Sequence, residues 1–252
     1  MQSLVAWLTV CLLLCWPGAA RAATGVSQAD TETLYYYHQK PPYVVNAERA
    51  EGDYFDLVRQ LNEVAGKNRY VLRFLPRARL DRDLNTGKLK GAILGVNPVW
   101  FNDVMQQRYF WTDPIFRDRD LVISHRNAPF RYGEELMTGK TVCYVRGYFY
   151  EGITQRVRSG EMHLFPVAKE DVIFDSLDQS RCDFGIISES MYRYLIRSGE
   201  VGADYFIANK PQAEFDRMIL VPLNQPALFN ELQSLLRRIN APGTEDVSGL
   251  TK

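Results

Sequence analysis

The chain has 252 residues, of which 46% are hydrophobic and 24% are charged. Its 30 Lys and Arg residues balance 30 Asp and Glu residues. This composition is ordinary for a globular protein. It argues against a nucleic-acid-binding protein, because such proteins show an excess of positive charge clustered on one face.

The first 22 residues predict a secretory signal peptide. Leu4 to Trp16 is an apolar run too short to span a bilayer, and a small-residue cleavage site follows it, ending at Ala22. Cys15 also follows an apolar run, as a lipoprotein cysteine does, but Leu14 stands where a lipobox needs a small residue. We therefore expect a periplasmic protein, with the leader cleaved near Ala22 and no stable membrane insertion.

Strands and helices alternate in the first part of the mature chain. Apolar residues at 54, 57, 58, 61, 64 and 65 form a helical stripe that Gly66 ends. The expected elements are a strand Thr33–Tyr37, a helix Tyr54–Ala65, a strand Tyr70–Phe74, a helix Arg77–Leu84 and a strand Ala92–Leu94. This alternation predicts an α/β lobe with a parallel-type sheet.

The alternation restarts after a long loop. The expected elements are strands at Leu121–Ser124, Lys140–Val145, His163–Phe165, Asp183–Ile187 and Met218–Val221, and helices at Tyr148–Arg158, Lys169–Ser180, from about Ser190, and at Gln225–Ile239. Two α/β units in series, with a final returning helix, predict two lobes with a ligand crevice between them.

The predicted boundaries follow from this order. Lobe 1 comprises residues 23–118 plus 217–240, and lobe 2 comprises residues 119–216. The chain is expected to cross between the lobes near Arg117 to Asp120 and near Lys210 to Asp216. Residues 241–252 are polar and form a flexible tail.

Two cysteines, Cys143 and Cys182, remain after the leader is removed. An oxidising compartment permits them to form a disulfide. Both fall in or beside neighbouring strands of lobe 2, where cross-strand geometry is often poor for a disulfide. A disulfide and two buried free thiols therefore both remain open.

The segment Trp111-Thr112-Asp113-Pro114-Ile115-Phe116 resembles the "FS-x-P-Y" signature of family 3 bacterial extracellular solute-binding proteins. Further resemblances follow in the family's order and spacing: Lys40-Pro41-Pro42-Tyr43, Gly52 to Leu57, Leu84 to Leu89, Glu135 to Val142, and Arg181 to Ile187. The resemblance covers roughly Thr33 to Ile239. It implies a type II periplasmic-binding-protein fold, α/β and two-lobed, with the ligand cleft between the lobes.

The resemblance also implies a function. Such a protein captures a small polar solute by hinge closure, as a monomer, and delivers it to an inner-membrane ABC permease or signals to a sensor kinase. In the family an Arg before the signature holds the ligand's carboxylate, but here that window contains Asn102, Met105 and Gln106. Ser188 stands where many amino-acid binders carry the Asp that receives the ligand's ammonium. We therefore expect ordinary α-amino acids to bind weakly or not at all.

One candidate binding segment follows a predicted strand in lobe 2. Arg146 is expected between that strand and a helix starting near Tyr148, with the backbone N–H groups of Gly147 and Tyr148 pointing into the crevice. This arrangement would suit an anionic group. The alternative is a surface Arg that covers the start of the helix.

Candidates in lobe 1 follow strand ends. Asn97 offers both a donor and acceptors, and Trp100 could stack on a flat or cationic ligand. Tyr37 and Tyr43 flank the Pro41-Pro42 turn, where family members place an aromatic wall. The alternative for each of these side chains is packing against the lobe.

Charged candidates remain around the cleft. Glu189 could replace the missing acid after a shift of one residue, or it could simply favour a helix N-terminus. Arg79, or Arg77 beside it, could replace the missing cation, or both could lie on a solvated helix face. No cofactor or metal site is expected, because His38, His125 and His163 lack metal-ligand spacing.

Two alternatives to solute capture remain. One is an enzyme on the same scaffold, resembling cyclohexadienyl dehydratases, with Glu189 as general acid or base. The other is an adaptor or sensor protein whose cleft has degenerated. No catalytic sequence motif such as G-x-S-x-G supports the enzyme, so we expect a protein without catalytic activity.

Overall fold

The computed structural model describes residues 31–133, 136–202 and 204–241. The predicted signal peptide lies outside these residues, as does the predicted tail except for Ala241. No helix in the described part of the chain is long and apolar enough to cross a membrane.

The first elements build a parallel three-stranded core. They are β1 Glu32–Tyr36, α1 Asp53–Ala65, β2 Tyr70–Phe74, α2 Arg77–Asn85 and β3 Ala92–Val96. Strand β1 lies between β2 and β3 and is parallel to both. Helix α1 ends as predicted at Gly66, whose φ of 69° is left-handed and suits glycine.

An irregular connection leads to the first long strand. It contains the 3-10 helix η2 Pro98–Phe101 and the short strand β4 Tyr109–Trp111, and it ends in β5 Phe116–His125. The sequence did not predict β4, because three residues are too few to show a strand period. It predicted only the second half of β5.

The next elements build a second parallel core. They are β6 Thr141–Val145, α3 Ile153–Arg158, β7 His163–Val167, α4 Val172–Asp178, β8 Phe184–Ser188, α5 Glu189–Ser198 and β9 Tyr205–Ile207. Strand β6 is parallel to β7 and β8, whereas β5 is antiparallel to β8 and β9. The sheet is therefore mixed rather than uniformly parallel.

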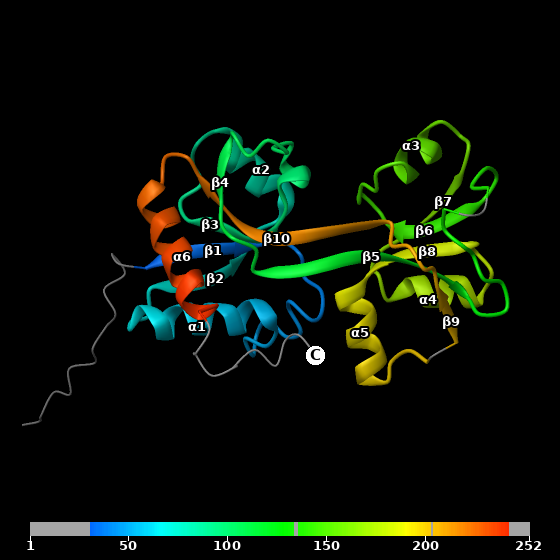
Figure 1. Ribbon diagram of the computed structural model, residues 1–252, viewed down its shortest axis with the longest axis horizontal. Helices are drawn as coiled ribbons and strands as arrows, with labels where there is room; N and C mark the ends of the chain where they lie inside the picture. The colour runs from blue at the N-terminus through cyan, green and yellow to red at the C-terminus, as the bar shows by residue number, and fades with distance from the viewer. Residues whose placement is uncertain (1–30, 134–135, 203, 242–252) are drawn as a thin grey trace, which may run out of the picture. The chain divides into compact units, whose positions relative to one another are not determined.

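Strand β10, Ala213–Pro222, connects the two parallel cores (Figure 1). Its first residues pair antiparallel with β5, and its last residues pair antiparallel with β3 and β4. The final helix α6, Pro226–Ile239, then contacts α1. We call β1–β4 with the end of β10 the first half of the sheet, and β5–β9 with the start of β10 the second half.

Each half has its own hydrophobic packing. In the first half, α1 and α6 bury Leu61 and Leu232 against strand residues such as Leu34 and Ile219. The helix predicted at Gln225–Ile239 is confirmed as α6, and its apolar stripe of Leu228, Leu232, Leu235 and Leu236 is buried. In the second half, α4 and α5 pack against the other sheet residues.

Cys143 on β6 and Cys182 before β8 form a disulfide, with Cα atoms 5.8 Å apart. The sequence left this pairing open. It is feasible because Cys182 precedes β8 and is not held in its ladder, so that its side chain can turn toward β6. The disulfide closes a loop within the second half.

The helix predicted at Tyr148–Arg158 is wrong at its start. Helix α3 begins at Ile153, and residues 146–152 form a loop with Gly147 and Gly152 at φ of 86° and 77°. Left-handed glycines interrupt helix formation, which explains the shorter helix. The predicted helix Lys169–Ser180 is likewise shortened to Val172–Asp178.

Candidate functional site

A buried ion pair joins the two long strands β5 and β10. The side chains of Arg217 and Asp118 are 2% and 1% exposed, and Arg217 Nη2 lies 3.1 Å from Asp118 Oδ2. Arg217 Nε donates to the Tyr43 hydroxyl at 2.9 Å, and Nη1 donates to the Gly95 carbonyl at 3.2 Å. All three guanidinium nitrogens are therefore engaged within the protein.

Asp118 is equally well satisfied. Its carboxylate accepts hydrogen bonds from the hydroxyls of Tyr43 and Ser190, both at 2.8 Å, and from the Ser190 amide at 3.2 Å. Burial raises the pKa of Asp118, but Arg217 and these hydrogen bonds outweigh burial and hold the pKa below its usual value. Asp118 is therefore ionised at neutral pH and fully compensated.

A second ion pair joins the halves outside the strand ladder. Lys40 Nζ lies 2.5 Å from Glu170 Oε1 and donates to the Ser188 hydroxyl at 2.8 Å. The Ser188 hydroxyl and amide donate to the other Glu170 oxygen at 2.7 and 3.2 Å. The side chains of Lys40 and Glu170 are 13% and 3% exposed, so the carboxylate is enclosed while the ammonium keeps some contact with water.

Half-buried aromatic rings lie beside these charges. The His38 ring centroid lies 4.0 Å from that of Tyr37, 5.5 Å from Trp100 and 6.4 Å from Tyr148. Trp100 in turn lies 5.2 Å from Phe215. We call these five residues the aromatic group. Because Tyr148 belongs to the second half and His38 to the first, the group spans the junction of the halves.

The His38 imidazole is uncharged at neutral pH. Burial is the main cause of its lowered pKa, and the positive charges of Arg217, Lys40 and Arg77 lower the pKa further. His38 therefore contributes a polar aromatic face, not a cation, to the aromatic group.

Asp120 lies diagonal to Phe215 of the aromatic group in the β5–β10 ladder, and its carboxylate has no hydrogen-bond or ion-pair partner among residues 31–133, 136–202 and 204–241. It is half-buried on β5, two residues after Asp118, so both side chains leave the strand on the same face. Burial and then the negative charge of Glu170 raise the pKa of Asp120 from 3.8 to about 7, although Lys40 opposes this rise. Asp120 therefore changes its charge near neutral pH.

The predicted segment Arg146–Tyr148 lies in the loop after β6. Arg146 and Gly147 are exposed, and the Tyr148 amide donates to the Val145 carbonyl at 3.1 Å. Because α3 begins only at Ile153, these amides do not form a helix N-terminus. The Tyr148 ring, however, belongs to the aromatic group.

The two predicted residues after β3 have different environments. Asn97 is buried, accepts from the Val99 amide at 2.9 Å and donates to the Asp216 carbonyl at 2.9 Å. It therefore links the end of β3 to β10. Trp100 is half-buried, in contact with His38, and keeps part of its ring accessible.

The two predicted tyrosines also differ. Tyr43 is 2% exposed and its hydroxyl belongs to the Arg217–Asp118 network. Tyr37 is half-buried in the aromatic group, where its hydroxyl accepts from Arg77 Nη1 at 3.0 Å.

The predicted charged residues are paired within the protein. Glu189 accepts from Arg119 at 2.5 and 2.8 Å and from Arg193 at 3.0 Å, and the Arg119 hydrogen bonds in particular hold its pKa below the usual value. Arg79 lies on an exposed face of α2 with its Nε 3.7 Å from Asp83. Arg77 Nε donates to Asp81 at 2.7 Å.

Sequence reasoning missed the charged residues that the fold brings together: Lys40, Asp118, Asp120, Glu170 and Arg217. One local signal existed for two of them. Asp118 and Asp120 alternate with Arg117 and Arg119 in a strand, which places both carboxylates on one face. No local pattern indicates Glu170, which is 130 residues from Lys40.

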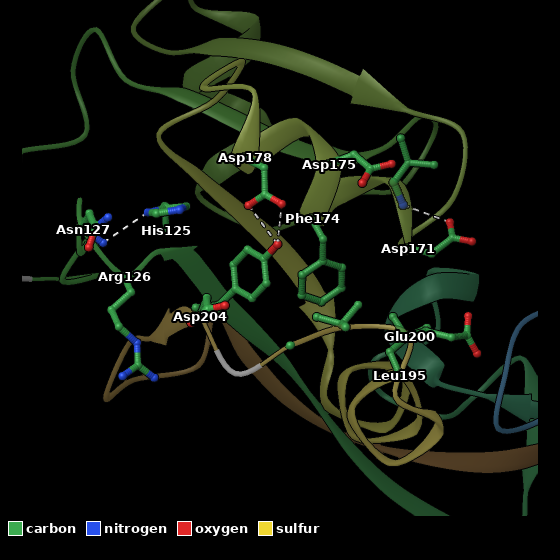
Figure 2. A pocket seen from close by; sticks show the side chains of 14 residues that line it. His125, Arg126, Asn127, Asp171, Phe174, Asp175, Asp178, Leu195, Glu200 and Asp204 are labelled. Atoms are coloured by element: carbon green, nitrogen blue, oxygen red, sulfur yellow. Dashed lines mark hydrogen bonds between the residues drawn. The ribbon is translucent and has the colours of Figure 1, made fainter.

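A hollow of about 740 Å³ lies elsewhere in the second half (Figure 2). Its lining is acidic and includes Asp171, Asp175, Asp178, Glu200 and Asp204. Both Asp178 oxygens accept from the Tyr205 hydroxyl at 2.9 Å. In the described part of the chain, no group of three His, Cys, Asp or Glu residues is arranged to hold a metal ion. No described residue of the first half lines this hollow, whereas the junction brings charged and aromatic side chains of both halves together.

The fold is shared with solved amino-acid-binding proteins. The ligand-binding core of GluR0 from Nostoc punctiforme, in complex with L-glutamate, is 16% identical, with a TM-score of 0.63 over 82% of this chain and 92% of that one. An ancestral arginine-binding protein bound to arginine is 14% identical, with a TM-score of 0.64 over 86% and 95%. A periplasmic binding protein of Salmonella typhimurium with high arginine specificity is 14% identical, with a TM-score of 0.60 over 84% and 94%.

No protein-family model matches the chain, and no curated protein matches it significantly. The solved structures nevertheless confirm the predicted fold: the chain has the α/β, two-lobed fold of periplasmic binding proteins. At 14–16% identity this likeness concerns the fold, so the site must be judged from its own residues.

Proposed function

We propose that this protein is an exported solute-binding protein that captures a small ligand between its two halves. The observation that carries the proposal is the junction itself, where Lys40, Glu170, Asp120 and the aromatic group meet from distant parts of the sequence. Ligand sites in α/β folds lie at such junctions, with apolar walls and a few polar groups. The solved relatives in fold bind glutamate or arginine, which supports the same general role.

The proposed mechanism is closure of two lobes, residues 23–118 with 217–240 and residues 119–216. The crossings are the paired segments of β5 and β10, where Asp120 lies opposite Ala213 and Arg117 opposite Asp216. A ligand favours closure only if it makes contacts in the closed form that the open form lacks. Residues from both halves, such as His38 and Tyr148, would supply those contacts.

The same proposal includes export and a partner. Residues 1–22 would direct the chain to the periplasm, and the Cys143–Cys182 disulfide fits an oxidising compartment. The partner would be an inner-membrane ABC permease or a sensor kinase that recognises the ligand-bound monomer. This part rests on analogy of fold.

A thermal-shift screen across amino acids, polyamines, dicarboxylates and aromatic acids tests the proposal. A bound compound raises the apparent melting temperature by mass action, and small-angle scattering should then show a smaller radius of gyration. Trp100→Ala should weaken the shift, whereas Val104→Ala, at a residue 66% exposed on the neighbouring loop, should not. If no compound raises the melting temperature and native mass spectrometry finds no retained small molecule, ligand capture is wrong, and an adaptor with a degenerate cleft becomes the better interpretation.

Acid–base catalysis is a second candidate that one observation favours. Glu189 is a poor general acid because Arg119 and Arg193 stabilise its ionised form. Asp120 is better suited, since its pKa of about 7 is near that of an efficient acid–base group. Turnover of prephenate or arogenate, lost in Asp120→Asn and retained in Glu189→Gln, would establish this activity; its absence would leave binding as the function.

A further inference from the structure

Three cations at the junction already have carboxylate partners, whereas Arg146, exposed in the loop before Tyr148, has no ion-pair partner among the described residues. Lys40 pairs with Glu170, Arg217 with Asp118, and Arg77 with Asp81 at 2.7 Å. The remaining nitrogens of Arg77 donate to the Tyr37 hydroxyl at 3.0 Å and the Trp100 carbonyl at 2.7 Å. At these three cations a ligand carboxylate would therefore have to displace an existing partner.

Such displacement is unfavourable at two of these cations. Glu170 and Asp118 have side chains that are 3% and 1% exposed. Removing Lys40 or Arg217 from them would leave a buried charge without a counterion, which costs more than a ligand carboxylate would recover. Lys40 and Arg217 are consequently poorly suited to hold a ligand carboxylate.

A negatively charged group, the carboxylate of Asp120, is available instead. Within residues 31–133, 136–202 and 204–241 this carboxylate has no hydrogen-bond or ion-pair partner. It is half-buried and so remains reachable. It lies near enough to Tyr148 and Tyr150 for its charge to raise their pKa values, although burial is the main cause of both shifts.

Aromatic rings on the same face of the sheet complete a site for a cation, because Phe215 lies opposite Asp118 and diagonal to Asp120 in the β5–β10 ladder, and its ring centroid is 5.2 Å from that of Trp100. His38, Trp100 and Tyr148 are half-buried, and Trp100 already faces one cation, with the Arg217 Cζ 5.2 Å from its ring centroid. Aromatic faces attract cations, most strongly where water is partly excluded. Uncharged His38 adds no repulsion.

We infer that the ligand is a small organic amine, whose ammonium group binds Asp120 and whose apolar body lies against the aromatic group, and that it is recognised without a carboxylate. This inference rests on the proposed function and specifies its ligand class. The ammonium would supply the counterion that Asp120 lacks among the described residues. Every existing ion pair at the junction would stay intact.

Three probes with one skeleton test the inference by calorimetry: 2-phenylethylamine, L-phenylalanine and 3-phenylpropionate. The amine should bind best, L-phenylalanine more weakly, and the propionate least. Asp120→Asn, which keeps the shape of the side chain, should weaken amine binding about tenfold, the factor that corresponds to one lost charge interaction. Asp113→Asn is the matched control, because Asp113 is exposed and pairs with Arg237 away from the junction.

The pH dependence provides a second readout on the same samples. Glu170, Lys40, Asp118, Arg217, Tyr148 and Tyr150 are the charged or titratable groups that act on Asp120. As pH rises from about 5.5 to about 8, Asp120 loses its proton and amine affinity should rise in the wild type, whereas Asp120→Asn should stay flat.

The outcomes separate the two proposals. If the propionate binds as well as the amine, or if Asp120→Asn leaves amine affinity and its pH dependence unchanged, the amine inference is overturned. If the amine probe fails while dicarboxylates or aromatic acids in the broad screen raise the melting temperature, ligand capture stands and the amine inference is overturned. If neither these probes nor the screen shows binding, the proposed function fails as well.

Discussion

Two ion pairs of similar chemistry hold the junction, but they depend on the fold in different ways. Arg217 and Asp118 lie on adjacent paired strands, and Tyr43, Ser190 and a backbone carbonyl complete their hydrogen bonding. Lys40 and Glu170 are outside the strand ladder and meet only because the two halves approach each other. The first pair is therefore a permanent part of the fold, whereas the second can separate if the halves move apart.

The largest expected effect tests the permanent pair. Arg217→Met should destabilise the protein by about 3–5 kcal/mol, because Asp118 would remain charged and buried without a partner. Urea unfolding followed by circular dichroism measures the loss. Adding Asp118→Asn to this variant should restore a large part of the lost stability. A nearly neutral Arg217→Met would contradict the interpretation of this pair as a permanent part of the fold.

Loss of the separable Lys40–Glu170 pair should reduce stability less than loss of the Arg217–Asp118 pair. Lys40→Met should cost about 1–3 kcal/mol, because Glu170 loses its cation but can regain water when the halves open. Small-angle scattering should also detect a larger mean radius of gyration. Lys140→Met is the control: its pair with Asp183 is more than a third exposed on both sides, and its loss should cost below about 1 kcal/mol. If Lys40→Met were as compact and as stable as Lys140→Met, the Lys40–Glu170 pair would not hold the two halves together.

Asp120 differs from both ion pairs because its carboxylate has no partner in the described part of the chain. Its folded-state pKa lies above its usual value of 3.8, so the folded protein binds a proton that the unfolded chain has released. Stability from this group is therefore present at low pH and falls as pH rises toward about 7. Asp120→Asn should be more stable than wild type at about pH 8 by at least about 1.4 kcal/mol, and this difference should shrink near pH 4. Thermal unfolding at both pH values measures it; a destabilised variant at pH 8 would reveal a missed partner.

The smallest effect is expected at the exposed pairs. Glu189→Gln should cost below about 1 kcal/mol, because Arg119 and Arg193 are both well solvated and can rearrange. Ligand affinity should be unchanged. A large loss of affinity, measured by calorimetry with any compound that the screen identifies, would show that the ligand binds closer to α5 than we propose.

Local patterns predicted most of the elements. The apolar stripe and Gly66 predicted α1 to within one residue at its start, and the stripe of α6 was equally clear. Three-residue strands such as β4 and β9 showed no readable period. The start of α3 was misjudged because apolar and aromatic residues at 148–150 continue a helical pattern that the Gly147 and Gly152 conformations prevent.

The site was partly predictable. Trp100 and Tyr148 were candidates because each follows a strand, and Tyr37 was a candidate because it flanks the Pro41-Pro42 turn; all three lie in the aromatic group. Asn97 was a candidate because it follows a strand and Tyr43 because it flanks the same turn, yet hydrogen bonds within the protein occupy their polar atoms. Position after a strand indicates proximity to the junction but does not show whether a side chain is available.

The sequence by itself determined most of the helices and strands and the two-lobed fold, because apolar periodicity and turn residues act over a few neighbouring positions. Only the tertiary structure decided which charges are compensated. Lys40 meets Glu170 across 130 residues and Arg217 meets Asp118 across 99, and no local pattern encodes such distances. The same packing leaves Asp120 without a partner among the described residues, and that difference between neighbouring carboxylates defines the candidate site.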